Sequence, residues 1–238
     1  MANFPFQRLQ ADLAKLIAST PPGSRLMSEP NLAKQMGVSR ATLREAMRTF
    51  ETQGLIRRRQ GSGTYVVGKF DVIDAGLEVL ESLETMSRRL NLEVSVSDLH
   101  TEPVTADKKT AEGLCVEEGK RITRVRRVMR AEGRPVAYLI DSLPEEILKP
   151  GDLPIEFGGS VLDFLLASGS DLQLSRADIS ATNATADVAK PLEIQRDDVL
   201  LRFESQLFDS KGKVVDYSVS YFIPGYFHFH VNRRVGGS

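Results

Sequence analysis

Arginines recur at every fourth position early in the chain, at Arg40, Arg44 and Arg48. If this segment is an α-helix, the spacing places all three side chains on one face. Guanidinium groups bind phosphate oxygens and the edges of guanine bases, so such a row can contact a nucleic acid. A row of like charges is more often the solvated face of a surface helix. The function of the row therefore depends on the helix that carries it.

A lone arginine farther along the chain offers a second kind of chemistry. Around Arg127 the two-residue period of a β-strand predicts one charged face and one face that is apolar apart from this residue. The charged face carries Arg124, Arg126 and Arg130, and the other carries Thr123, Val125, Arg127 and Met129. A charge among apolar neighbours needs an opposite charge, so Arg127 is expected to bind an anionic ligand or an internal carboxylate. The internal candidates are Asp163, Asp178 and Asp216.

Residue types that commonly carry catalysis or bind metals are few and isolated. His228 and His230 form an H-x-H pair, but His100 is the only other histidine, which favours structural or solvated histidines over a metal site. The single cysteine, Cys115, has no basic neighbour in sequence and is expected to be a small buried residue. We therefore expect no catalytic residue, no metal and no cofactor.

The arginine row lies on the last of three predicted helices. The first ends before Pro21, the second follows Ser28 and stops at Gly37, and the third follows Ser39 and reaches Gln53. Their apolar positions at helical spacing are Phe6, Leu9, Leu13, Leu16 and Ile17, then Leu32, Ala33 and Met36, then Leu43, Met47 and Phe50. A short turn containing glycine joins the second and third helices. This is the spacing of a helix-turn-helix, whose second helix enters the major groove of DNA.

Two short strands are predicted directly after the third helix. The segments 55–59 and 64–67 flank Gln60-Gly61-Ser62-Gly63, which is typical of a hairpin with a glycine turn. The first strand would carry Arg57, Arg58 and Arg59. Three helices followed by such a hairpin predict a winged helix-turn-helix domain over residues 1–68.

The distribution of charge agrees with a nucleic-acid partner for this segment alone. Residues 1–70 contain 11 Lys and Arg but 4 Asp and Glu, although the whole chain of 238 residues has a net charge of −1. A basic part can approach the phosphates while the acidic remainder stays away from them. No apolar run approaches the roughly 18 residues of a membrane span, and the N-terminus lacks the features of a signal peptide. We expect a cytoplasmic protein without a membrane partner.

The first domain resembles the N-terminal domain of the GntR family of bacterial transcriptional regulators. The resemblance rests on Ser28-Glu29, on the run from Gly37 to Ala46 (GVSRATLREA), on Glu51-x-x-Gly54-Leu55-Ile56, and on the run from Arg59 to Val66 (RQGSGTYV). It implies that Arg40 and Arg44 read bases, that Ser28, Ser39 and Thr42 hold phosphates, and that Gly61 lets the wing tip enter the minor groove. We add Arg48, Arg58 and Arg59 to the expected DNA contacts. One departure is Pro30, because many members carry an arginine there.

The rest of the chain contains an internal duplication. Thr105-Ala106-Asp107 recurs as Thr185-Ala186-Asp187, and Gly133-Arg134-Pro135-Val136-Ala137-Tyr138 is answered by Gly212-Lys213-Val214-Val215-Asp216-Tyr217. Each copy predicts a strand, a short helix and a hairpin, so the two copies are expected to build one mainly antiparallel sheet. Residues 69–75 are expected to form a linker, and a helix is expected from Gly76 to Leu90.

This second part, residues 76–238, resembles the ligand-sensing UTRA domain of the HutC branch of the GntR family, whose fold is shared with chorismate lyase. The carriers are Gly133-x-Pro135-Val136-Ala137, the run from Gly159 to Leu165 (GSVLDFL), Ser175-Arg176-Ala177, and the run from Asp216 to Tyr221 (DYSVSY). The resemblance implies a small, often anionic metabolite bound between the two halves. The residues expected to contact it are Arg127, Tyr138, Ser160, Arg176 and Asp216, although Ser160 fits equally well as the N-cap of the helix that it begins.

The combined expectation is an α+β protein that regulates transcription in response to a ligand. It would bind a pseudo-palindromic operator in double-stranded DNA as a homodimer, most simply as a repressor that a small anionic metabolite releases. Because Met129 leaves Arg127 as a single arginine on its face, one carboxylate, phosphate or phosphonate is expected on the ligand. The alternative is an enzyme related to chorismate lyase and fused to a DNA-binding domain, which the absence of a general acid–base pair disfavours.

Overall fold

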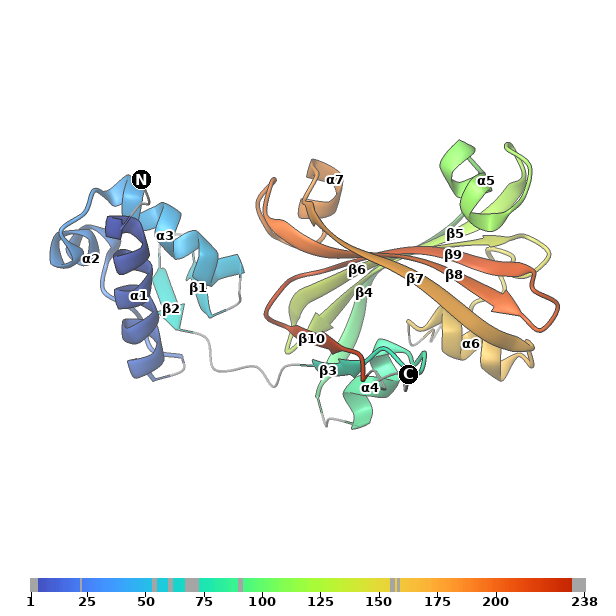
Figure 1. The fold of residues 1–238 in the computed structure, drawn as a ribbon, viewed down its shortest axis with the longest axis horizontal. Coiled ribbons are helices and arrows are strands. Elements are labelled where there is room, and N and C mark those ends of the chain that lie inside the picture. The colour runs from blue at the N-terminus through green and yellow to red at the C-terminus, as the bar shows by residue number, and fades with distance from the viewer. Residues whose placement is uncertain are drawn as a thin grey trace, which may run out of the picture. The chain divides into compact units, whose positions relative to one another are not determined.

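The protein is described by a computed structural model that covers residues 4–232, except for 22, 53–54, 60–61, 67–72, 90–91, 155–156 and 158. The chain divides into two compact units, residues 1–72 with 224–226 and residues 73–223 with 227–238. Figure 1 shows a helical first unit and a second unit built on a large sheet. Within the described residues, no helix combines the length and the apolar composition needed to cross a membrane.

The first unit contains the three predicted helices, α1 (Phe4–Ser19), α2 (Glu29–Met36) and α3 (Arg40–Thr52). The α2 helix ends at Gly37, whose φ of 67° is the left-handed conformation that glycine adopts without strain. At the start of α3 the backbone amide of Thr42 donates to Oγ of Ser39 at 3.1 Å, which confirms the predicted cap. The predicted apolar stripes meet in one core with Leu13, Leu32 and Leu43 fully buried.

The predicted wing is also present. Strands β1 (Ile56–Arg59) and β2 (Gly63–Val66) pair in antiparallel register, with Ile56 opposite Val66 and Arg58 opposite Thr64. Ile56 and Val66 are buried against the helices, so the hairpin packs onto the helical core through this pair. Gly61, at the predicted wing tip, lies outside the described residues.

The second unit confirms the duplication. Each copy supplies a strand, a helix and a hairpin: β4 (Val94–Thr105), α5 (Lys108–Leu114), β5 (Arg121–Ala131) and β6 (Arg134–Pro144), then β7 (Leu172–Asn183), α7 (Ala186–Ala189), β8 (Val199–Asp209) and β9 (Val214–Phe222). The strand order is β4-β5-β6-β9-β8-β7, and every neighbouring pair is antiparallel. The two copies therefore meet at the centre of one six-stranded sheet, along β6 and β9.

The two faces of this sheet are covered differently. Helices α5 and α7 lie on one face, whereas α4 (Leu83–Arg89), α6 (Val161–Ala167) and a small two-stranded sheet lie on the other (Figure 1). The small sheet pairs β3 (Ile73–Gly76) with β10 (Phe227–His230) in parallel. Four phenylalanines pack with ring centroids 4.6–5.4 Å apart and hold β10 against the large sheet. They are Phe203, Phe222, Phe227 and Phe229.

Three expectations about local structure differ from what the structure shows. The helix expected from Gly76 to Leu90 begins only at Leu83, because β3 ends at Gly76 and the backbone from Leu77 to Ser82 is irregular. The strand β3 starts inside the range expected for the linker, and its partner β10 lies about 150 residues away, which no local pattern indicates. Cys115 is exposed rather than buried, because it ends α5 in the left-handed conformation with φ of 55°.

Candidate functional site

The exposed face of α3 carries the predicted arginine row. Arg40 and Arg44 are exposed and Arg48 is partly buried, while Leu43, Met47 and Phe50 on the opposite side of the helix are buried in the core. The Ser39 and Thr42 hydroxyls lie 2.8 Å apart at the N-terminus of α3, next to Arg40. Ser39, Arg40, Thr42 and Arg44 are thus gathered at the start of this helix.

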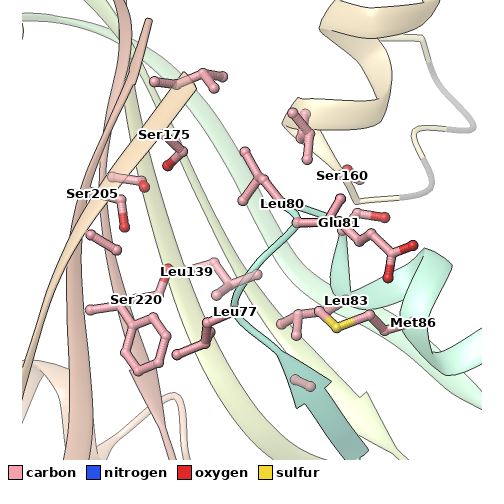
Figure 2. Close-up of a pocket in the computed structure, with 18 of the residues that line it drawn as sticks. Leu77, Leu80, Glu81, Leu83, Met86, Leu139, Ser160, Ser175, Ser205 and Ser220 are labelled. Atoms are coloured by element: carbon pink, nitrogen blue, oxygen red, sulfur yellow. The ribbon is translucent and has the colours of Figure 1, made fainter. Parts of the chain in front are cut away.

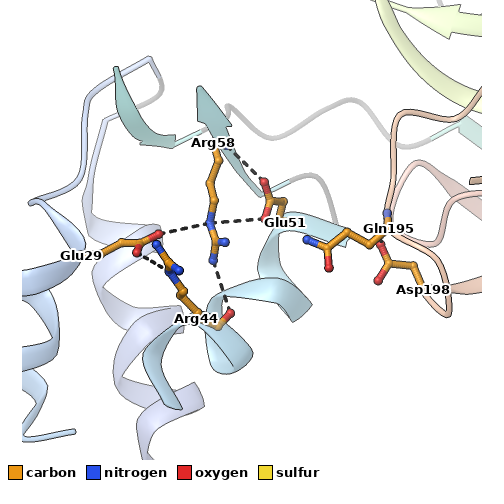
Figure 3. Close-up of polar contacts among 6 residues, drawn as sticks. All are labelled: Glu29, Arg44, Glu51, Arg58, Gln195 and Asp198. Carbon is orange, nitrogen blue, oxygen red and sulfur yellow. Dashed lines mark hydrogen bonds and ion pairs between the residues drawn. The ribbon is translucent and has the colours of Figure 1, made fainter. Parts of the chain in front are cut away.

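An ion-pair network that sequence reasoning missed joins α2, α3 and the wing (Figure 3). Nε of Arg44 donates to Oε2 of Glu29 at 2.6 Å. Nε of Arg58 on β1 lies 3.7 Å from Glu29 and 3.5 Å from Glu51, and its Nη2 donates to the carbonyl oxygen of Arg44 at 3.3 Å. From the sequence, Glu29 was noted only as part of the Ser28-Glu29 motif. Its wider role depends on tertiary contacts with the wing.

The remaining predicted DNA contacts are placed as follows. Ser28 is exposed directly before α2, and its hydroxyl makes no capping hydrogen bond in the described structure. Pro30 is exposed in the first turn of the same helix. The side chain of Arg59 and all of Gly61 lie outside the described residues, so their expected roles remain predictions.

A cavity of about 750 Å³ lies on the face of the large sheet that also carries α4 and α6. Ser175, Ser205 and Ser220 line it from the strands, and the irregular segment 77–82 lines it opposite them (Figure 2). Leu83 and Met86 of α4 and Ser160 at the start of α6 complete the part seen in this view. The cavity combines apolar side chains with a smaller number of polar groups, as ligand pockets usually do.

Arg127 lines this cavity, but its charge is already matched inside the protein. Arg127 is 6% exposed, and its Nη1 donates to Oδ2 of Asp141 on the neighbouring strand. Asp141 is opposite Val125 in the sheet, so it shares a face with Arg127 and lies diagonally across from it. The carboxylate partner is therefore none of the three considered from the sequence. Pairing across β5 and β6 determines this contact.

Two further carboxyl groups lie beside this pair. Asp216 on β9 is buried, and burial together with the nearby Asp141 raises its pKa well above the ordinary value. Its Oδ1 accepts a hydrogen bond from the backbone amide of Ser142 at 3.2 Å. Burial also raises the pKa of Glu84 on α4, although the charge of Arg127 opposes that shift. Glu84 and Asp141 were not predicted, because only the fold brings α4 and β6 together.

The five expected effector residues do not converge on one site. Arg127, Ser160 and Asp216 line the cavity, whereas Tyr138 and Arg176 do not. Leu139 faces the cavity, so its neighbour Tyr138 points to the opposite face of the sheet, and Arg176 likewise alternates with Ser175 and Ala177. The Ser160 hydroxyl caps α6 by accepting from the amide of Asp163 at 2.9 Å. Arg176 instead pairs with Asp178 at 3.4 Å.

The H-x-H pair lies on β10, with the rings of His228 and His230 stacked at 5.7 Å between centroids. Throughout the part of the chain that the structure describes, no group of three or more His, Cys, Asp or Glu side chains is arranged to hold a metal ion.

The fold and these two surfaces define a DNA-binding transcriptional regulator with a separate ligand-sensing unit. The family model of bacterial regulatory proteins of the gntR family matches residues 6–66, and that of the UTRA domain matches residues 89–228. The chain belongs to the GntR family of transcriptional regulators, with a UTRA domain as its second unit.

Named relatives agree with this assignment. The chain is 27% identical over 226 residues to the HTH-type transcriptional regulator Rv0792c of Mycobacterium tuberculosis, covering 92% of this chain and 81% of the relative. It is 23% identical over 202 residues to the HTH-type transcriptional regulator GgaR of Escherichia coli, covering 84% and 78%. Both relatives are named as transcriptional regulators, which supports a regulator and gives no support to the alternative of a chorismate-lyase-related enzyme.

Solved structures share the fold. PhnF from Mycobacterium smegmatis superposes with a TM-score of 0.65 at 20% identity, covering 96% of this chain and 100% of the PhnF chain. The possible transcriptional regulator YydK from Bacillus subtilis gives a TM-score of 0.57 at 20% identity, with coverage of 97% and 100%.

Proposed function

We propose that the protein is a repressor that binds a pseudo-palindromic operator as a homodimer and is released when a small metabolite fills the cavity of its UTRA domain. Such a protein acts in the cytoplasm, where its DNA is. The observation that carries the proposal is the exposed arginine row on α3, because its N-terminal residues Arg40 and Arg44 are free of the core while the opposite face is buried.

The expected roles within the first unit follow from its geometry. Arg44 projects from the first turns of the recognition helix and is 57% exposed, which suits contact with a base edge. The paired hydroxyls of Ser39 and Thr42 lie where phosphates flank a recognition helix, and Ser28 is exposed at the start of α2. Arg58 connects the wing to α3, so we expect the wing and the helix to bind DNA as one body.

The edge strand β7 supports the homodimer. A free sheet edge presents unpaired backbone groups that favour pairing with another strand, and proteins usually protect such edges. The other edge, β4, is protected by Pro103 and by an irregular register between Ser97 and His100. From Ser175 to Asn183, β7 is regular, and the strand exposes Leu174 and Ile179. We propose that two copies associate through β7.

The cavity supports ligand control, but not the expected negative charge of the ligand. An anionic metabolite would need Arg127 to be free, and Arg127 is paired with Asp141. Ser160 is also engaged, since it caps α6. We therefore propose a small-molecule effector that is not required to carry an anionic group.

Selection of operator DNA from a random pool tests the proposed function. We expect enrichment of an inverted repeat, and we expect Arg44→Ala to lose about 1 to 3 kcal/mol of binding free energy on the selected DNA, with less loss on scrambled DNA. Lys15→Ala, an exposed cation on α1, is the matched control. Equal losses on both DNAs at fixed salt would show that Arg44 contacts phosphate only, and absence of an enriched sequence would overturn the assignment of a specific operator.

A further inference from the structure

Large apolar side chains that remain exposed are concentrated around the cavity of the second unit. Ten are exposed among the residues that the structure describes, and seven of these line the cavity. They come from the segment 77–82, from α6 and β7, and from the residue that follows β10. Leu80, Leu166 and Val231 are each about half exposed. A single exposed apolar residue is ordinary, whereas a group of them around one site marks a binding surface.

This exposed apolar group surrounds a hollow and not a flat surface. The cavity volume of about 750 Å³ is that of a small-molecule pocket. The leucines of the segment 77–82 face the serine-bearing strands across the cavity (Figure 2). The segment is held at both ends, because the Leu77 amide donates to the His230 carbonyl at 2.9 Å and the Ser82 hydroxyl donates to Asp163 at 2.6 Å. A small molecule can therefore fill the space between the segment and the sheet.

Charged groups that line the cavity are engaged within the protein. Arg127 is the one basic residue among the described residues of the lining, and it pairs with Asp141. Asp216, Glu78 and Glu84 each accept a hydrogen bond from a backbone amide. A charged ligand would lose its hydration without gaining a free counter-charge, which costs far more than the transfer of a neutral group. The cavity therefore favours an uncharged molecule.

Serine hydroxyls on the sheet offer hydrogen bonds without charge. Four serines line the cavity from β7, β8 and β9, and none of their hydroxyls bonds to another part of the described chain. All four are partly buried, and their hydroxyls remain reachable from the cavity. Ser205 of β8 lies opposite Ser218 of β9, so two of these hydroxyls are adjacent and can bond to one hydroxyl or carbonyl group of a ligand. The four are Ser175, Ser205, Ser218 and Ser220.

Resting on the proposed function, we propose that the effector is an uncharged amphiphile, with an aliphatic chain against the exposed apolar side chains and a hydroxyl or carbonyl group at the serines. Burial of the chain removes apolar surface of both the ligand and the protein from water, which drives binding. The serine hydroxyls then orient the polar end of the ligand. No charge is transferred into the protein, so the Arg127–Asp141 pair stays intact on binding.

A homologous series of primary alcohols tests the aliphatic chain: butanol, hexanol and octanol, each titrated calorimetrically into the full-length protein. Affinity should rise about fourfold for each added methylene group that the cavity buries. Octanoate and octylammonium have chains of the same length as octanol and test the charge. Each should bind at least about tenfold more weakly than octanol, because each brings a charge that finds no free counter-charge.

Variants of the lining locate the two ends of the ligand. Leu80→Ser with Leu166→Ser should weaken binding of octanol by about tenfold or more and binding of butanol by less, because the shorter chain buries less apolar surface. Ser205→Ala with Ser218→Ala should weaken binding of all three alcohols alike, by about two- to tenfold. Val199→Ser, on β8 outside the cavity and as exposed as Leu80, is the matched control and should bind like the wild type.

The outcomes separate this inference from the proposed function. If affinity does not rise with chain length, or if no alcohol binds, the amphiphile is wrong, and operator selection still decides whether the protein binds a specific operator. If octanoate or octylammonium binds as tightly as octanol, the uncharged class is wrong. If Leu80→Ser with Leu166→Ser dissociates the dimer and keeps octanol binding, a second copy covers these side chains instead. If that variant does not fold, the ranking of the probes on the wild type still decides the ligand class. Octanol binding without any change in occupancy of the selected DNA would overturn ligand control in the proposed function.

Discussion

Nε of Arg44 lies 2.6 Å from Oε2 of Glu29, so the arginine at the exposed start of α3 is held by an acid from the preceding helix. Glu29 also lies 3.7 Å from Nε of Arg58 on the wing. One carboxylate therefore orients two arginines that we expect to face DNA. Because Arg44 is more than half exposed, the ion pair contributes little to stability. We expect its main effect to be the positioning of the two arginines.

Glu29→Gln should lower the ratio of operator to non-specific binding. Loss of the negative charge strengthens attraction to any DNA, while loss of the ion pairs lets Arg44 and Arg58 move. We expect the ratio to fall by up to about fivefold, the equivalent of an exposed ion pair of about 1 kcal/mol. Fluorescence anisotropy on selected and scrambled DNA at one salt concentration measures it. Glu45→Gln, exposed on the same recognition helix, is the charge-matched control, and equal ratios in the two variants would contradict a positioning role.

Replacement of Arg127 should destabilise the UTRA domain itself. Arg127→Met keeps most of the volume but leaves Asp141 and Asp216 buried without a cation. Removing one partner of a buried ion pair typically costs about 3 to 5 kcal/mol. We expect the loss, measured by urea unfolding, to be larger at pH 8 than at pH 5, because burial raises the pKa of Asp216 and this carboxyl group can hold a proton at the lower pH. Arg124→Met, on the opposite face of the strand, should cost less than about 1 kcal/mol. A small, pH-independent loss in Arg127→Met would show that the pair is not structural.

Glu84→Gln should become more stabilising as pH rises. The pKa of Glu84 is raised in the folded state, so folding favours the protonated carboxyl, and the wild type loses stability as pH increases from the unfolded-state pKa through the folded-state pKa. The glutamine has no such loss. Its free energy of unfolding relative to the wild type should therefore increase as pH rises from the ordinary pKa of 4.5 to pH 8, by about 1.4 kcal/mol for each unit of pKa shift. A constant difference across this range would place Glu84 in contact with solvent.

Local patterns predicted the first unit almost completely, since its helices and hairpin are adjacent in sequence and each has its own apolar stripe and end signal. The duplication likewise revealed the β5–β6 and β8–β9 hairpins, because each turns at a glycine with positive φ, Gly133 and Gly212.

The cavity of the second unit was less predictable from the sequence. Arg127 was singled out correctly as a buried cation, but its partner Asp141 depends on the register of β5 against β6.

The part of the site opposite the sheet could not be predicted for the same reason. Residues 77–82 and Glu84 reach the cavity only because β3 pairs with β10, at the far end of the sequence. Tyr138 was assigned to the pocket from its place in the duplicated hairpin, yet a shift of one residue along a strand moves a side chain to the other face. Its neighbour Leu139 lines the cavity instead.

Gly113→Ala should destabilise the packing of α5 on the sheet. A Cβ atom at Gly113 would lie 2.4 Å from Cδ2 of Tyr217, closer than side chains can approach. The ring cannot move freely, because the Tyr217 hydroxyl donates to Oε1 of Glu204. We expect a loss of about 1 to 3 kcal/mol in thermal or urea unfolding, reduced by the better helix propensity of alanine. Gly151→Ala is the control, since nothing lies within 4 Å of its Cβ position. Equal stability of the two variants would show that α5 shifts to accept the methyl group.

Lysines on β7 should dissociate the dimer. Leu174 is 62% exposed and Ile179 47% exposed on a strand whose outer edge has no neighbour within the described sheet. Charged side chains on an edge strand oppose pairing with a second copy, because they would be brought together across the two-fold axis and desolvated. The double variant Leu174→Lys with Ile179→Lys should raise the dimer dissociation constant by at least about tenfold, or about 1.4 kcal/mol, in sedimentation equilibrium.

Leu99→Lys on β4, the opposite edge, is the control and should leave the wild-type dissociation constant unchanged. Dissociation by Leu99→Lys instead would place the interface on β4, and a wild-type protein that is monomeric at micromolar concentration, both free and on its operator, would exclude the homodimer.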